Sequence, residues 1–191
     1  SKQSTIETPR PRTSTPPVPQ SPDLVFVDTE TTGFSPYSDE VIEIAAIRVD
    51  GALEELDRFQ SYLIPHGTVR ATHIHGLTRD FLLANGRPQE EVYCEFAEFL
   101  GDNLIAGHNV NYDLGMLQAN GIRNNVKLNL RIGYDTLPNA RSNLQLPSYK
   151  LGRIVTALNL GDGQLRCHNA LDDVLATIEL AKHLRWKSRR P

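Results

Sequence analysis

The 191-residue chain has few cysteines, little net charge and no long apolar run. Its two cysteines, Cys94 and Cys167, provide neither a disulfide framework nor a CxxC zinc pattern, which fits a reducing compartment. No segment approaches the roughly 18 apolar residues of a membrane helix, and no secretory signal is visible. A net charge of −3 gives no strong bulk field for attracting nucleic acid or an anionic membrane. We therefore expect a cytoplasmic protein without membrane contacts, in which any nucleic-acid binding rests on local patches or metal ions.

Residues 1–22 contain almost no apolar side chains. They hold six of the twelve prolines, mixed with serine and threonine, so they cannot bury a core. We interpret them as a disordered linker, through which another domain is fused to or associated with the folded domain of residues 23–191. A processed terminus or a cloning remnant is the alternative.

Hydrophobic periodicity after this segment predicts five strands and a series of helices. A DG pair at residues 50–51 lies between two apolar runs and is typical of a hairpin. The strands are expected at 24–28, 41–49, 53–64, 103–108 and 131–135, and the helices near 78–86, 88–100, 110–119 (ended by Gly121), 148–158 and 169–187. Three antiparallel strands followed by alternating helices and strands indicate an α/β fold, a mixed sheet with helices packed on it.

The segment VFVDTETTG at residues 25–33 begins as an apolar strand but then carries Asp28 and Glu30. Side chains alternate along a strand, so these two lie on one face with Cα atoms about 6.5 Å apart. Carboxylates about 5 Å apart repel each other by roughly 3 kcal/mol at an effective dielectric constant of about 20. A cation, a bound proton or exposure to water must compensate this repulsion.

Two further acids and one histidine occupy unusual positions. Asp113 lies on the shoulder of an apolar helical stripe, and Asp173 lies on an apolar stripe of the last helix, where burial requires a partner. The neighbouring Asp172 falls between two stripes and is expected to be solvated. His168 precedes this helix, and a loop imidazole beside a buried acid can activate water.

Each of these residues also has an ordinary structural interpretation. Asp28 could end a strand in a turn, Asp113 and Asp173 could be first-turn acids favoured by the helix dipole, and His168 could be solvated. Together, however, four acids at strand ends or early helix turns would repel strongly without cations. This favours divalent metal ions with oxygen ligands.

Three motifs occur in a characteristic order: VFVDTETTG, then GHNVNYDLGML, then CHNALDDVLAT. In this order they resemble the DEDDh family of DnaQ-like 3′→5′ exonucleases, which includes the proofreading epsilon subunit of bacterial DNA polymerase III. The resemblance covers residues 24–184. It implies an RNase H-like fold with a five-stranded mixed sheet flanked by helices.

The resemblance also implies phosphodiester hydrolysis with two divalent ions, Mg²⁺ or Mn²⁺. Asp28, Glu30 and Asp173 would hold the ion that presents the attacking water. Asp28 would bridge to a second ion, which Asp113 supports, and His168 would be the general base. The products would be nucleoside 5′-monophosphates. The third motif contains a histidine and no tyrosine, which favours the histidine branch of the family.

Other motif residues are candidates for contact with the terminal nucleotide. Thr31, Thr32 and Phe34 follow the first motif, with a turn as the ordinary alternative. His75 belongs to HIHGLT (73–78), whose two histidines could also suggest a metal, although no further ligands cluster there. Asn109 could line the site or cap the next helix. Tyr112 stands where the family commonly has phenylalanine, a mild change.

The expected partners are DNA 3′ ends, with single-stranded ends preferred. A 3′→5′ exoribonuclease or oligoribonuclease is the alternative within the same chemistry. A non-catalytic module that binds nucleic acid or a partner protein is an alternative of another class, but no catalytic position is lost. A general metal-dependent phosphatase would explain the metals but not the motif order. Proofreading, repair and 3′-end trimming during CRISPR adaptation are all compatible with such a module.

Overall fold

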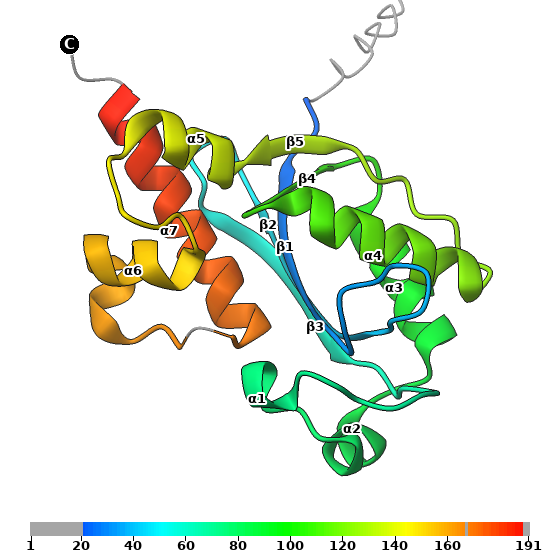
Figure 1. Cartoon of the computed structure of the whole chain (residues 1–191). Coiled ribbons are helices and arrows are strands. Elements are labelled where there is room, and N and C mark those ends of the chain that lie inside the picture. The colour runs from blue at the N-terminus through cyan, green and yellow to red at the C-terminus, as the bar shows by residue number, and fades with distance from the viewer. Residues whose placement is uncertain (1–20, 167, 189–191) are drawn as a thin grey trace, which may run out of the picture.

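The computed structural model describes residues 21–166 and 168–188, and a five-stranded sheet forms its centre (Figure 1). The strands lie in the order β3-β2-β1-β4-β5. Their bounds are Leu24–Thr31 (β1), Val41–Val49 (β2), Glu55–Tyr62 (β3), Leu104–Gly107 (β4) and Ile132–Asp135 (β5). The pairs β1–β2 and β2–β3 are antiparallel, whereas β4 is parallel to both β1 and β5. The mixed sheet predicted from the sequence is therefore confirmed.

The expected hairpin joins β2 to β3. The Asp50 carboxylate accepts hydrogen bonds from the backbone N–H groups of Ala52 and Glu54, and Leu53 adopts a φ of 64°. An aspartate that accepts backbone donors two residues later is a common way to stabilise such turns. The turn thus sets the register between β2 and β3, in which Glu43 of β2 pairs with Tyr62 of β3.

Eight helical segments surround the sheet within the described residues. They are α1 (Thr72–His75), α2 (Arg79–Asn85), α3 (Gln89–Leu100), α4 (Val110–Arg123), α5 (Thr136–Asn143), α6 (Leu151–Leu158), the 3₁₀ helix η1 (Leu160–Gly163) and α7 (Ala170–Ser188). None of the helices in this part of the chain is long and apolar enough to cross a membrane.

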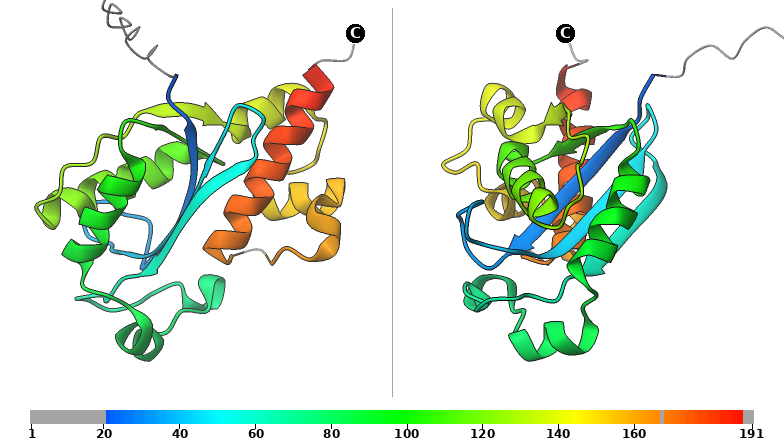
Figure 2. Two further views of the ribbon diagram at one scale, coloured as in Figure 1. Left: turned by 180° about the vertical axis from the view of Figure 1, so that it is seen from behind. Right: turned by 90° about the vertical axis from the view of Figure 1, so that its right-hand side faces the viewer.

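Two hydrophobic cores cover opposite faces of the sheet, and the two further views show the helices on either side (Figure 2). The side chains of Val25 and Val27 pack with α3 and α4. Phe26 points the other way, into a core with Val174 and Ile178 of α7. The alternation of β1 side chains therefore directs its even-numbered residues, including both acids, toward α7.

Several predicted boundaries need correction. β1 continues to Thr31, because its pairing with β2 extends past the two acids. Gly121 does not end α4, which runs on to Arg123. A side chain at Gly121 would lie 2.8 Å from the carbonyl oxygen of Val126, so the glycine permits close approach of the following loop. The helices α1 and α5 and the 3₁₀ helix were not predicted, because they are short and carry no sustained apolar period. The linker assigned to residues 1–22 lies almost wholly outside the described residues.

Candidate active site

The carboxyl-terminal half of β1 extends beyond its parallel neighbour. β1 pairs with β4 only from Leu24 to Phe26, because β4 ends at Gly107 and the chain turns into α4. The remaining part of β1 carries Asp28 and Glu30. Such a position, at the carboxyl end of strands where a neighbour departs, is where open α/β sheets place their binding sites.

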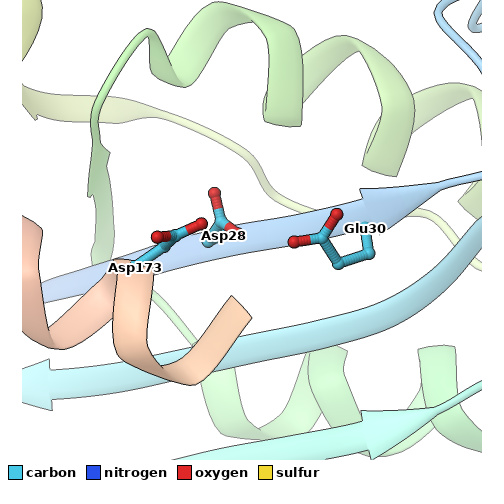
Figure 3. A group of neighbouring side chains, drawn as sticks. All are labelled: Asp28, Glu30 and Asp173. Carbon is cyan, nitrogen blue, oxygen red and sulfur yellow. The ribbon is translucent and has the colours of Figure 1, made fainter. Parts of the chain in front are cut away.

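Three carboxylates meet at this position (Figure 3). Asp28 and Glu30 come from β1, and Asp173 comes from the first turn of α7. Each offers an oxygen atom, and these oxygens all lie within 4.8 Å of one another. The structure therefore brings together side chains that are separated by more than 140 residues in the sequence.

Asp113 lies next to this group but outside it. Its side chain is 3% exposed, and its Oδ1 atom accepts hydrogen bonds from the backbone N–H of Thr29 at 3.0 Å and from the Thr29 hydroxyl at 2.7 Å. These bonds hold the start of α4 against β1. They bring the carboxylate close enough to make its charge the largest electrostatic influence on Asp28.

Burial and mutual repulsion strongly raise the pKa values of these acids. Burial raises the pKa of Asp28 well above its usual range, and the charges of Asp113, Asp173 and Glu30 raise it further. Burial, reinforced by Asp173, raises the pKa of Glu30 to about 8. Burial also raises the pKa values of Asp113 and Asp173 to about 7, although hydrogen bonds from Thr29 oppose the shift in Asp113. Without a cation these groups resist ionisation near neutral pH.

A divalent cation fits this arrangement. The ligand atoms are carboxylate oxygens, which suit hard ions such as Mg²⁺ and Mn²⁺. None of the described lysines or arginines forms an ion pair with Asp28, Glu30 or Asp173. The HIHGLT histidines belong to no potential metal-binding group in the described part of the chain.

His168 lies on the loop that leads into α7. It is exposed, has a φ of 69°, and lines the same cleft as Asp173. Its backbone N–H donates a hydrogen bond to the Asp173 carboxylate and lowers the pKa of that acid, against the larger effect of burial. The preceding residue, Cys167, lies outside the described residues.

Asp172 lies outside the group of three carboxylates. Its Oδ2 atom accepts a hydrogen bond from the backbone N–H of Arg166 at 2.9 Å, and its own backbone N–H donates to Asn169. It therefore stabilises the entry into α7, whereas Asp173 joins the group of three. Asp172 is partly rather than fully exposed.

Of the residues predicted to contact the terminal nucleotide, Phe34 and Asn109 line the cleft with Asp173. Phe34 is 76% exposed. Asn109 precedes α4 with a φ of 61°, and its side chain makes no capping hydrogen bond, so it does not cap the helix in the usual way. Instead, the Asp135 carboxylate accepts hydrogen bonds from the backbone N–H groups of Asn109 and Val110.

Thr31, Thr32 and His75 take part in hydrogen bonds within the surrounding loops. The Thr31 hydroxyl contacts the Tyr112 hydroxyl at 2.7 Å, which gives the tyrosine in the second motif a polar partner. The buried Thr32 hydroxyl donates to Asp39. His75 contacts the carbonyl oxygen of Arg70 and accepts from the backbone N–H of Leu77, and burial lowers its pKa.

Glu43 is an acid of this site that the sequence analysis missed. It lies opposite Glu30 on β2, is 2% exposed, and accepts a hydrogen bond from Gln60 at 3.0 Å. Its charge raises the pKa values of Glu30 and Asp173. A signal was present, since Glu43 is the only acid within the otherwise apolar run VIEIAA.

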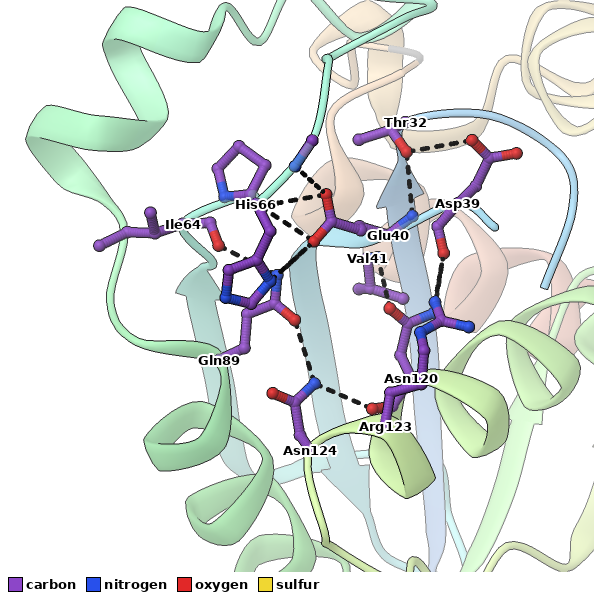
Figure 4. Close-up of polar contacts among 12 residues, drawn as sticks. Thr32, Asp39, Glu40, Val41, Ile64, His66, Gln89, Asn120, Arg123 and Asn124 are labelled. Atoms are coloured by element: carbon purple, nitrogen blue, oxygen red, sulfur yellow. Dashed lines mark hydrogen bonds and ion pairs between the residues drawn. The ribbon is translucent and has the colours of Figure 1, made fainter. Parts of the chain in front are cut away.

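A second group of buried acids lies in the loop between β1 and β2 (Figure 4). Asp39 accepts hydrogen bonds from the backbone N–H of Ser35 and from Arg70. Glu40 accepts from the backbone N–H groups of His66 and Gly67 and from Gln89. This loop group ties the segment that carries Phe34 to the segment before α1 and to the first residue of α3.

Comparison with known proteins identifies relatives over most of the folded part. The RNase_T family model, described as an exonuclease, matches residues 25–181. The PolC-type DNA polymerase III of Thermotoga maritima is 38% identical over 160 residues, and that of Bacillus cereus is 35% identical over 156 residues. The matches cover 82% and 80% of this chain but only 11% of each relative.

Solved structures of exonuclease I share the fold. The Escherichia coli enzyme in complex with a dT13 oligonucleotide superposes with a TM-score of 0.77 at 23% identity, covering 88% of this chain and 42% of the other. Its zinc-bound form in complex with single-stranded DNA also gives a TM-score of 0.77, at 24% identity, covering 90% and 42%. At these identities the likeness concerns the fold.

Proposed function

The chain belongs to the RNase_T exonuclease family and is a DnaQ-like 3′→5′ exonuclease with an RNase H-like fold; we propose that it acts on the 3′ ends of DNA, preferably single-stranded. The observation that carries this proposal is the group of three carboxylates at the open end of β1. The PolC-type relatives are DNA polymerases, and one solved neighbour holds an oligothymidylate. Because the chain spans 11% of those relatives, we further propose that it works as one module of a larger protein, with residues 1–22 as the linker.

Asp28, Glu30 and Asp173 would hold one divalent ion, and Asp28 together with Asp113 would hold a second. Two ions bound in this way stabilise both the attacking and the leaving oxygen of a phosphodiester. The Thr29 hydrogen bonds occupy only Oδ1 of Asp113, which leaves Oδ2 for this role, either directly or through water. The products would be nucleoside 5′-monophosphates.

His168 would accept the proton of the attacking water. Two features support this role: the imidazole lies on a loop that lines the cleft, and its own backbone N–H bonds the carboxylate of Asp173. The same residue therefore orients a metal ligand through its backbone and presents a base through its side chain. A positioned general base typically contributes about 10² to 10⁴ in rate.

The terminal nucleotide would lie between Phe34 and Asn109, which line the cleft with Asp173. Thr31, Thr32 and His75 would support these contacts through their hydrogen bonds in the adjoining loops. None of these residues distinguishes DNA from RNA by its chemistry alone, so RNA trimming is the second candidate function.

A gel assay with a 5′-labelled DNA oligomer and its RNA counterpart tests the proposal. Each is incubated with the protein in Mg²⁺, Mn²⁺ or EDTA, with Asp28→Ala as the control. We expect a metal-dependent ladder that shortens from the 3′ end of DNA and is absent with the variant. Stronger cleavage of RNA would favour the second candidate. Intact substrate with a folded protein would indicate a non-catalytic binding module.

A further inference from the structure

A positively charged wall lies in the cleft that Asp173 lines. The cleft has a volume of about 1000 Å³, and Arg141, Lys150 and Arg153 line it together with His168 and Asp173. We propose that these three cations bind successive phosphates of one nucleic-acid strand and guide its 3′ end to the carboxylates. This inference rests on the function proposed above and adds the path of the substrate.

The three cations differ from most others in the molecule. Arg48, Arg58, Arg87 and Lys182 form ion pairs with neighbouring acids. By contrast, the exposed side chains of Arg141, Lys150 and Arg153 have no hydrogen-bond or ion-pair partner among residues 21–166 and 168–188. Three free cations in one cleft of a protein with net charge −3 form a local site for an anion chain.

The backbone that carries the wall is held in place by a half-buried histidine. His108 follows β4, and its Nε2–H donates to the carbonyl oxygen of Tyr149 at 2.7 Å, while Nδ1 contacts the Thr136 hydroxyl at 2.8 Å. The Tyr149 hydroxyl donates in turn to the carbonyl oxygen of Leu144. These bonds fix the segment before α6 against the start of α5, so the cations project from a constrained frame. Such a frame lowers the entropic cost of ordering a ligand.

The rest of the lining suits a single strand. Among the residues that the structure describes, Asp173 is the only acid that lines this cleft. Leu137, Tyr149 and Ile74 line the same cleft, and their apolar surfaces can contact bases. Proteins that bind a single strand without sequence preference usually contact its phosphates with cations and its bases with apolar or aromatic side chains.

The test compares the triple variant R141Q/K150Q/R153Q with wild type and with K127Q. Lys127 is a matched control, because it is exposed, has no side-chain partner among the described residues and lines a different hollow beside α4. Affinity for a labelled oligothymidylate is measured by fluorescence anisotropy over a range of salt concentrations. Ca²⁺ replaces Mg²⁺, and a gel verifies that the oligomer stays intact.

For the triple variant we expect the slope of log K against log salt to become shallower by about 2, which is three phosphate contacts at about 0.7 each. At about 0.1 M salt this corresponds to a loss of affinity of roughly tenfold to a hundredfold. In Mg²⁺ the KM for the oligomer should rise more than kcat falls. K127Q should bind like wild type.

An unchanged salt slope in a folded triple variant would refute the proposal that the three cations bind phosphates. An equal loss of affinity in K127Q would refute it as well. Failure of the proposed function is detected separately. Wild-type protein and Asp28→Ala are assayed with p-nitrophenyl thymidine 5′-phosphate, a mononucleotide ester too short to follow the wall. No hydrolysis by wild type would refute the catalytic proposal, whereas the binding measurement would still show whether the three cations bind the strand.

Discussion

Glu30 and Glu40 lie only ten residues apart in the sequence, yet they belong to two groups of acids whose charges are compensated in opposite ways. Glu30, in the group of three carboxylates, has its pKa raised to about 8, mainly by burial and then by the charge of Asp173. In the loop group, burial also raises the pKa of Glu40, but hydrogen bonds from His66, Gly67 and Gln89 outweigh this effect, and the net pKa is lowered.

The difference lies in the donors that surround each carboxylate. Every oxygen of Asp39 and Glu40 accepts at least one hydrogen bond from a backbone N–H or a side chain. The carboxylates of Asp28, Glu30 and Asp173 have no cationic partner in the described residues, so their repulsion is left for a metal ion to offset. Carboxylates saturated by donors stabilise a loop, whereas unsaturated ones form a binding site.

Replacing one acid in each group by alanine should have opposite effects on hydrolysis and on stability. Asp28→Ala removes the shared metal ligand, so hydrolysis should fall to background while repulsion between the remaining acids is relieved. Glu40→Ala removes the acceptor of the buried Gln89 amide and of the exposed backbone N–H groups of His66 and Gly67, which should lower the free energy of unfolding by about 1 kcal/mol. Its kcat for a mononucleotide ester should stay near the wild-type value. Denaturant unfolding and initial rates measure both effects, and an active Asp28→Ala protein would refute the metal assignment.

His168→Ala should separate catalysis from stability within the catalytic group. Loss of the general base should slow hydrolysis by about 10² to 10⁴, whereas the backbone N–H that bonds Asp173 remains in place. Thermal unfolding should therefore be unchanged, and Mn²⁺ should still bind. A drop in Mn²⁺ affinity that parallels the drop in rate would show instead that the histidine acts on the metal site.

The pH dependence of stability should reveal the raised pKa values. A folded-state pKa of about 8 for Glu30, against 4.5 ordinarily, means that the folded protein keeps a proton that the unfolded chain releases. In EDTA the unfolding free energy should therefore fall as the pH rises from about 4.5 to about 8. Asp39 and Glu40 have lowered pKa values and act in the opposite sense, adding stability that is lost only as the pH falls through those lowered values.

A divalent metal ion should offset the loss of unfolding free energy at high pH. Metal at about 100 times its dissociation constant adds roughly 2.7 kcal/mol, and the gain should be larger at pH 8 than at pH 5, because protons compete for the ligands. Thermal unfolding with and without Mn²⁺ measures this gain. A gain that is equal at both pH values would contradict the assignment of raised pKa values to the metal ligands.

The smallest effect should come from the neighbour of a catalytic residue. Asp172→Ala loses the contact with the backbone of Arg166 at the edge of α7, so its rate should stay within about threefold of wild type and its stability within about 0.5 kcal/mol. Asp173→Ala should be inactive. An inactive Asp172→Ala beside an active Asp173→Ala would show that the third acid of the group is wrongly identified.

Local patterns were sufficient for most of the sheet and for the strand acids. Alternation along β1 predicted that Asp28 and Glu30 share a face, because the covalent geometry of a strand sets this over three residues. The extent of the same strand was underestimated, since the pairing with β2 that continues to Thr31 is a contact between distant segments. Gly121 was misjudged for a similar reason, because the loop at Val126 determines its role.

The sequence by itself determined the order of the strands and of the longer helices, the motif acids and the family to which they belong. Only the tertiary structure decided which acids meet, that Glu43 lies opposite Glu30, and that three free cations share a cleft with Asp173. The physical reason is the distance along the chain over which each interaction acts. Periodicity and turn chemistry act over a few residues, whereas the charge balance of a site depends on side chains that come together when a helix packs on a sheet.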